Sequence, residues 1–403
     1  MIHSGLMRSW TKRAVALVVL AACVGSASAA VPFEKALPED VVAYLSVKNI
    51  NALKEQVAGT KTAQMLKDPA MKPFVDGVSS EVNKILDMAQ QMTGISLPEI
   101  LSIPTGQIAV AIKVEEKEPS SMPYVYFLAD VKGKEDALKS LLDRLTQIAE
   151  EQGMPKETKD DVTSFKIGGG APRQELAFSI KGGIFAIGND AESLKATVGA
   201  LESGRKEKSL ADNARFQDFR QSAGGSGDFE LFVDVARAVE LAGDIAGAEA
   251  GAAVATLGLN AFQSAGVSGT VGQGDFDHNT QFILNVKGET PLLKLFNMPA
   301  KPTKPEAWVP DNVVSYFSFN WDLEQFYNTL SSVLNAVMPG AMDQADAMLA
   351  GPDPDNPLLN IKKDLIGPLG NRISIMSDMI EEKKGQPTGR VLIAWQQIGR
   401  AHV

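Results

Sequence analysis

Histidine and cysteine are nearly absent from this chain. Its 403 residues include three histidines and one cysteine, and His278 is the only histidine outside the two ends. Structural zinc needs several Cys or His ligands, so such a site is excluded. Serine–histidine or cysteine–histidine catalysis would rest on His278 alone. Because it follows Gly274-Asp275-Phe276-Asp277 between two alternating apolar runs, we interpret His278 as an exposed hairpin-turn residue.

Positive charge is also scarce. The chain has 39 Lys and Arg against 49 Asp and Glu, which gives a net charge of -10. Nucleic-acid-binding proteins present basic patches, so this acidic balance excludes nucleic acid as a partner. Arg8, Lys12 and Arg13 lie in the N-terminal segment, and its removal would make the remaining chain more acidic still.

The motifs that bind cofactors or metals are incomplete. The glycines at 168–170 lack the Gly-Lys-Ser/Thr ending of a phosphate loop. The glycine-rich run at 266–272 has no helix after it, so we interpret it as a strand of small residues. Residues 353–356 and the pair Asp275 and Asp277 lack the remaining ligands of a calcium loop. We therefore predict no catalytic residue, no cofactor and no metal, and we expect that the protein is not an enzyme.

Only one long apolar run occurs, close to the N-terminus. Residues 14–24 follow a basic region and precede the small residues at 26–30. This order is typical of a cleavable signal, and the run is shorter than the roughly 20 residues of a membrane span. We predict a signal peptide over residues 1–29 and an exported protein, periplasmic or extracellular.

The signal contains a second processing pattern. Leu20-Ala21-Ala22-Cys23 resembles a lipobox, in which the cysteine is acylated and becomes the new N-terminus. Cys23 is thus a candidate lipidation residue, and the acyl chain would be the only attachment to a membrane that we predict. The Ala27-Ser28-Ala29 cleavage site is equally well formed. Both forms of export stay open, with a soluble product slightly favoured.

Apolar periodicity predicts strand pairs interleaved with helices. The absence of regular strand-helix-strand alternation favours an α+β fold with a largely antiparallel sheet packed by helices. Strands are predicted at 42–47, 108–114, 124–129, 175–180, 183–187, 228–233, 267–271 and 280–286, and helices at 74–92, 138–149, 190–201 and 235–257.

Three short segments recur later in the chain in the same order, with matching apolar and polar positions. The matched pairs are residues 37–47 with 309–319, 101–107 with 365–371, and 115–117 with 381–383. Three ordered matches are much harder to obtain by chance than one, and the long period excludes a solenoid. The sequence therefore predicts duplication of a whole domain.

The repeat defines the predicted domains. We expect a first α+β unit over 31–300, a Pro-rich linker over 301–308 and the start of a second unit over 309–396. The second copy reaches the strand at 390–395, the counterpart of 124–129, so we expect it to be incomplete.

The chain resembles a family of exported bacterial proteins catalogued as domain of unknown function 3352. The resemblance lies in residues 37–44, 182–188 and 257–260 and in the restart at Val309-Pro310, and it extends over most of the mature chain. These are structural signatures. The family has no assigned activity, so the resemblance implies no site residue.

Three functions are consistent with these observations. The leading hypothesis is a non-catalytic envelope protein that binds or scaffolds an unknown envelope partner. A periplasmic carrier of an apolar ligand is the second, because the small residues at 235–257 leave space for one. A hydrolase is the third, and it requires two carboxylates, or a serine and a lysine, in one cleft.

The last residues have an unusual sequence. Residues 397–403, Gln-Ile-Gly-Arg-Ala-His-Val, match the translation of a sequencing adapter, AGATCGGAAGAGCACACGTC, whose next triplet is a stop. We predict that this segment is an artefact of the gene sequence, and the alternative is a genuine tail. Inspection of the raw nucleotides tests this, since reads that lack the adapter would remove the prediction.

Overall fold

The structure is a computed structural model that describes residues 31–77, 102–115, 122–167, 173–272, 276–301, 304–338, 340–351, 359–381 and 387–397. The chain forms two compact units. The first takes in the described residues up to Ile245 together with Phe262–Val286. The second takes in Ala246–Ala261 and the described residues from Lys287 onward. The predicted signal peptide and most of the helix predicted at 74–92 lie outside the described residues.

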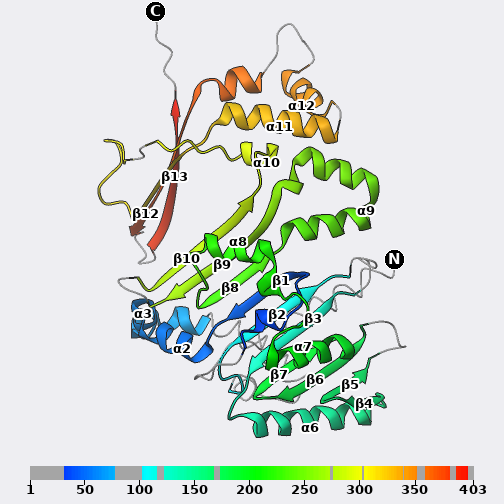
Figure 1. Cartoon of the computed structure of the whole chain (residues 1–403). Helices are drawn as coiled ribbons and strands as arrows, with labels where there is room; N and C mark the ends of the chain where they lie inside the picture. The colour runs from blue at the N-terminus through cyan, green and yellow to red at the C-terminus, as the bar shows by residue number, and fades with distance from the viewer. Residues whose placement is uncertain are drawn as a thin grey trace, which may run out of the picture. The chain divides into compact units, whose positions relative to one another are not determined.

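The first unit is built on one large sheet (Figure 1). Its described residues form a 10-stranded sheet of order β10-β9-β8-β1-β2-β3-β7-β6-β5-β4, in which each pairing is antiparallel. The predicted α+β class with an antiparallel sheet is confirmed. The strands are β1 (Val41–Val47), β2 (Ile108–Lys113), β3 (Tyr124–Asp130), β4 (Lys156–Lys159), β5 (Val162–Lys166), β6 (Glu175–Lys181), β7 (Ile184–Gly188), β8 (Phe229–Val233), β9 (Phe262–Val271) and β10 (His278–Val286).

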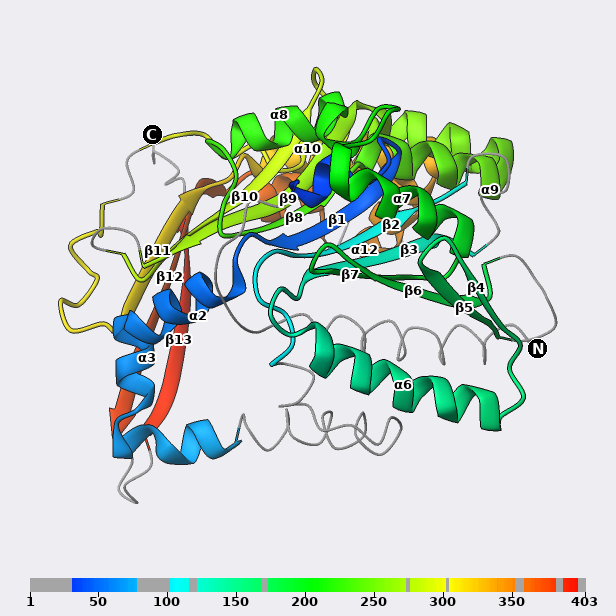
Figure 2. The ribbon, with the colours of Figure 1, turned by 60° about the horizontal axis from the view of Figure 1, so that its bottom comes forward.

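Helices cover both faces of this sheet. Figure 2 shows α7 and α8 over one face and α6 across the other. Asp190 and Asn213 cap α7 and α8 by accepting from backbone N–H groups of the first turn. The helices are η1 (Phe33–Lys35), α2 (Ile50–Gly59), α3 (Lys61–Leu66), η2 (Pro69–Met71), α6 (Glu135–Glu151), α7 (Ala191–Ser203), η3 (Leu210–Asp212), α8 (Ala214–Ser222) and α9 (Val235–Leu257), whose first part belongs to this unit.

The two faces carry separate hydrophobic cores, because successive side chains of a strand point to opposite sides. In β3, Leu128 belongs to the cluster that contains the buried residues of α7 and α8. Its neighbours Phe127 and Ala129 belong to the cluster that contains Leu138 and Leu141 of α6. The helix predicted at 138–149 therefore buries Leu138, Leu141 and Leu142 against this face, while Ile148 near its end is exposed.

The small residues of β9 allow close packing against β8. A side chain at Gly266 would place its Cβ 2.1 Å from the carbonyl oxygen of Leu231 and 2.6 Å from the ring of Phe219. At Gly269 the Cβ would lie 2.1 Å from the ring of Phe229. The run 266–272 therefore lies in a strand, as predicted, except for Gly272, which follows the end of β9. The absent side chains of Gly266 and Gly269 leave room for the neighbouring groups.

The second unit contains a smaller antiparallel sheet of order β11-β12-β13. None of the helices in the described parts of the chain is long and apolar enough to cross a membrane. The strands are β11 (Ser315–Asn320), β12 (Leu369–Glu381) and β13 (Pro387–Gln397), and the helices are η4 (Leu259–Ala261), α10 (Pro291–Lys294), α11 (Leu323–Val337), α12 (Ala341–Ala350) and the π-helix η5 (Ile361–Ile366).

The packing of β9 predicts the effect of a single methyl group. We expect Gly266→Ala to lower the free energy of unfolding by about 3 kcal/mol, because the carbonyl of Leu231 must move away. Gly199→Ala is the matched control, since a Cβ there meets nothing within 4 Å and alanine is the better helix former in α7. Urea titration of both variants checks this, and equal stabilities would contradict the close approach.

Candidate functional site

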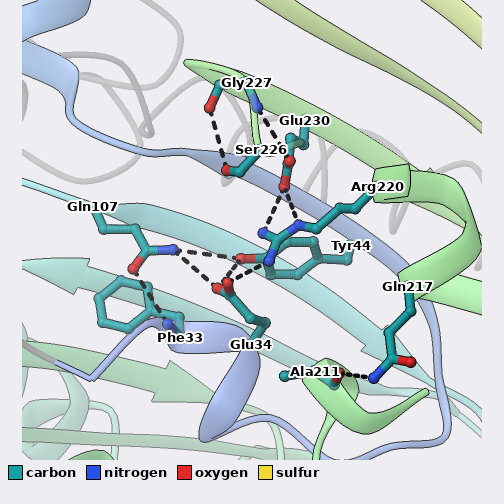
Figure 3. A network of polar contacts seen from close by, with 10 residues as sticks. All are labelled: Phe33, Glu34, Tyr44, Gln107, Ala211, Gln217, Arg220, Ser226, Gly227 and Glu230. Carbon is teal, nitrogen blue, oxygen red and sulfur yellow. Dashed lines mark hydrogen bonds and ion pairs between the residues drawn. The ribbon is translucent and has the colours of Figure 1, made fainter. Parts of the chain in front are cut away.

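Arg220 lies between two carboxylates that are buried in the first unit (Figure 3). Its Nη1 donates to Glu34 Oε1 at 2.6 Å, and its Nε and Nη2 donate to Glu230 Oε2 at 3.2 and 2.7 Å. The Glu230 side chain is 1% exposed and that of Glu34 is 9% exposed. Hydrogen bonds between charged groups are the strongest in proteins. One guanidinium thus connects η1, α8 and β8.

Tyr44 on β1 and Gln107, the residue before β2, are uncharged side chains that add further hydrogen bonds to this cluster. The Tyr44 hydroxyl donates to Glu34 Oε2 at 3.3 Å. Gln107 Nε2 lies 3.5 Å from both that oxygen and the Tyr44 hydroxyl, while its Oε1 accepts from the Phe33 N–H at 3.2 Å. The polar groups of η1 are therefore satisfied on the sheet, where an unpaired group would be destabilising.

Three groups of the cluster have shifted pKa values. Burial acts to raise the pKa of Glu34, but the charge and hydrogen bond of Arg220 outweigh it and lower the pKa below the ordinary 4.5. Burial, together with the charge of Glu34, raises the pKa of Tyr44. Burial acts to lower the pKa of Arg220, but hydrogen bonds and charges from Glu230 and Glu34 raise it. Proton-transfer catalysts have pKa values near the working pH, so this arrangement favours structure over catalysis.

Sequence reasoning missed these residues because none of them stands in a catalytic motif. A signal was nevertheless present in the strand predicted at 228–233. Glu230 shares one face of this strand with Phe232, which is fully buried. An acidic side chain at a core-facing position requires a cation nearby, although the sequence does not say which one.

A similar cluster surrounds Arg372 in the second unit. Arg372 Nη1 lies 3.0 Å from Glu306 Oε1, its Nη2 donates to the Tyr316 hydroxyl at 3.0 Å, and its Nε donates to Ser318 Oγ at 3.2 Å. Burial acts to raise the pKa of this tyrosine, but hydrogen bonds to Ser318, Ser374 and Arg372 lower it. The cluster is more open than the first, because the Glu306 side chain is 39% exposed.

A pocket of about 440 Å³ adjoins the Arg372 cluster. Its two largest side chains are Trp308 and Trp395, which are 47% and 40% exposed. The indole N–H of Trp308 donates to Glu306 Oε2 at 2.7 Å, which orients this ring. The pocket is lined by Glu306, Trp308, Arg372, Ser374, Ala394, Trp395 and Gln396.

A smaller pocket of about 200 Å³ lies at the start of α7, and most of its lining is charged. Two of its carboxylates hold the helix: Asp190 accepts from Ser193 N–H at 2.8 Å, and Glu175 accepts from Ala191 N–H at 3.1 Å. Within the described residues, no group of three or more His, Cys, Asp or Glu side chains is placed to hold a metal ion.

The structure does not bring the candidate residues of the sequence analysis together in one site. His278 is exposed and pairs with Val271 as the first residue of β10, so it lies at the strand end and not in the turn itself. Asp277 accepts from the N–H groups of Lys61 and Thr62 at 2.8 and 2.7 Å, at the start of α3. Cys23 and the motifs at 168–170 and 353–356 lie outside the described residues.

Comparisons with known proteins found no family model, no curated protein and no solved structure that matches the chain. The resemblance to the exported bacterial family therefore stays a prediction. Inferences about function rest on the chain's own residues.

The lowered pKa of Glu34 predicts a pH-dependent stability. A carboxylate whose folded pKa lies below 4.5 stabilises the fold above that pH, and the contribution is lost as the pH falls through the folded value. We expect Glu34→Gln to lower the free energy of unfolding by about 2 kcal/mol at pH 7, with a smaller difference from the wild type below pH 4.5.

Denaturant titration at several pH values measures this difference. Glu192→Gln is the control, because Glu192 is exposed and its ion pair with Lys159 Nζ is long, at 3.8 Å. This variant should match the wild type throughout. A Glu34→Gln defect of constant size from neutral to acid pH would contradict the role given to the Arg220 ion pair.

Proposed function

We propose that this is an exported cell-envelope protein, built from two tandem copies of one domain, that acts as a non-catalytic binding or scaffold module. The charged cluster of the first unit favours this function, because both of its carboxylates are buried and paired with Arg220. Export rests on the signal predicted at residues 1–29. The partner is another component of the envelope, and nucleic acid is excluded by the acidic charge.

The duplication is supported by the pairing of the strands. β1-β2-β3 and β11-β12-β13 follow one another in the same order and direction. Val47 pairs with Ile108, and the matching residue Phe319 pairs with Ile373, one residue beyond the position that the match of 101–107 with 365–371 gives.

The two arginine clusters give independent support for the duplication. Glu306 precedes Val309-Pro310 by the interval that separates Glu34 from Leu37-Pro38. Glu34 accepts from the Tyr44 hydroxyl directly, and Glu306 pairs with Arg372, which donates to the Tyr316 hydroxyl. Gln107 directly precedes β2, whereas Arg372 lies within β12, and each bonds the tyrosine hydroxyl of its own sheet. A glutamate and a tyrosine at matching sequence positions thus belong to one polar cluster in each unit, which favours the duplication.

A binding role is favoured above all by an exposed apolar row on the first unit's sheet. Leu231, Val267 and Phe282 are cross-strand neighbours on β8, β9 and β10. Phe282 is 84% exposed, Leu231 is 40% exposed, and Leu284, further along β10, is 51% exposed. Exposed apolar groups gathered in this way are typical of protein–protein contact sites.

The two edges of the same sheet differ in a way that supports this location. The β4 edge is a short strand of sequence Lys-Glu-Thr-Lys, all of it exposed. Charged, short edges are protected against strand pairing. The β10 edge, His278–Val286, is longer and carries no Lys, Arg, Asp or Glu. The end of the sheet that bears the apolar row is therefore also the end without this protection.

No observation favours the carrier or the hydrolase. A carrier would hold its ligand against α9. Neither of the two pockets described above is lined by residues of this helix, of which the structure describes the side chains at 235–245 and 254–257. The acidic pocket at α7 uses Asp190 and Glu175 to hold the helix start. Both functions stay alternatives.

The apolar row predicts the effect of a double substitution. We expect Phe282→Ser with Leu284→Ser to remove the partner adduct that a lysine-reactive crosslinker traps in the envelope of producing cells. The thermal midpoint should stay unchanged, because both side chains are already exposed. Met348→Ser is the control, since Met348 on α12 is equally exposed at 84% and should keep the adduct. An adduct that survives the double substitution would disprove this binding surface.

A further inference from the structure

The outer edge of β10 presents a regular row of backbone donors and acceptors. The carbonyl oxygen of Asp277 accepts from the N–H of Gly272 at 2.8 Å, so the backbone groups of residue 277 face β9. This orientation alternates along an antiparallel strand. The backbone groups that face away from β9 are therefore those of residues 278, 280, 282 and 284. Because β10 is the last strand at its end of the sheet in the described part of the chain, no neighbouring strand there binds them.

This edge is uncharged along its length, but the residues just beyond its two ends have opposite charges. Asp277 directly precedes His278–Val286, and Lys287 directly follows it. When two such strands pair antiparallel over their whole length, residue 278 of one lies opposite residue 286 of the other. Asp277 of each copy then lies opposite Lys287 of the other, so the same favourable charge pair occurs at both ends.

The apolar row fits the same pairing. Phe282 is the middle residue of β10, so it lies on the twofold axis, opposite Phe282 of the second copy. In each copy it continues the line of Leu231 and Val267 across the sheet. The two rows therefore join into one, and the rings, each 84% exposed in a single copy, gain a cross-strand partner.

We propose that two copies of this chain associate through β10, whose antiparallel pairing joins their large sheets into one. The chain has a net charge of -10, so two copies repel each other except where they meet at an uncharged surface. A second copy is favoured over a strand of another protein, because β10 itself supplies the opposite charges and the aromatic partner in one register. The inference rests on the binding role proposed above for this end of the sheet.

Sedimentation equilibrium of the purified mature chain tests the association. We expect a reversible dimer, which Lys287→Glu should weaken about tenfold, because a glutamate then lies opposite Asp277 at each end. Lys139→Glu is the matched control, since it makes the same change of charge at an exposed residue of α6 and should leave the dimer unchanged. A chain that stays monomeric, or equal effects of the two substitutions, would overturn the proposal.

Single cysteines test the register. Cys23 is the only cysteine of the sequence, so a chain that begins after residue 29 has none. Phe282→Cys should form a disulfide between two copies on mild oxidation, because opposite residues of a hydrogen-bonded pair have Cα atoms about 5.5 Å apart. Thr280→Cys should form one only when mixed with Leu284→Cys, which lies opposite it. Equal self-crosslinking at 280 and 282 would contradict the antiparallel pairing.

The result is separate from that of the crosslinking test in cells. Sedimentation of the purified chain detects only a second copy, and the mass of the adduct in cells distinguishes a second copy from another envelope component. A monomeric chain whose adduct is lost on substitution of Phe282 and Leu284 would disprove pairing through β10 and leave the proposed binding surface intact. A dimer with an adduct that survives the substitution would do the reverse.

Discussion

The first unit depends on a single cation placed between two buried carboxylates. Removing Glu34 and Glu230 from water is unfavourable unless both are paired, and Arg220 pairs with both through separate nitrogens. Glu34 lies 186 residues from this arginine in the chain. The ion pair therefore fixes η1 against α8 and the central strands, and Phe33 and Leu37 on either side of the glutamate become fully buried.

This constraint divides the large sheet into parts with different roles. Its centre is covered on both faces, by α7 and α8 on one side and by α6 on the other. At the β10 end, Phe282 and Leu284 are exposed. A covered centre stabilises the domain, and an uncovered apolar end is available for another molecule.

The second unit pairs its glutamate in a different way. Arg372 in β12 lies 3.0 Å from Glu306, which comes from the segment before β11. This glutamate therefore has its cation on a strand of the small sheet, whereas Glu34 of the first unit is paired with Arg220 of the helix α8.

The class of fold and most strands of the large sheet could be predicted from the amino-acid sequence, because apolar spacing and alternation act over a few residues. Apolar spacing indicated α6 and alternation indicated eight of the ten strands, whereas β4, β5 and α8 were not predicted. The signal peptide and the repeat are likewise sequence predictions. The tertiary structure decided which polar residues meet and which apolar ones stay exposed. Nothing in the sequence near Glu230 names Arg220 as its partner, and nothing near Phe282 shows that its row lacks a cover, since both depend on segments brought together only by folding.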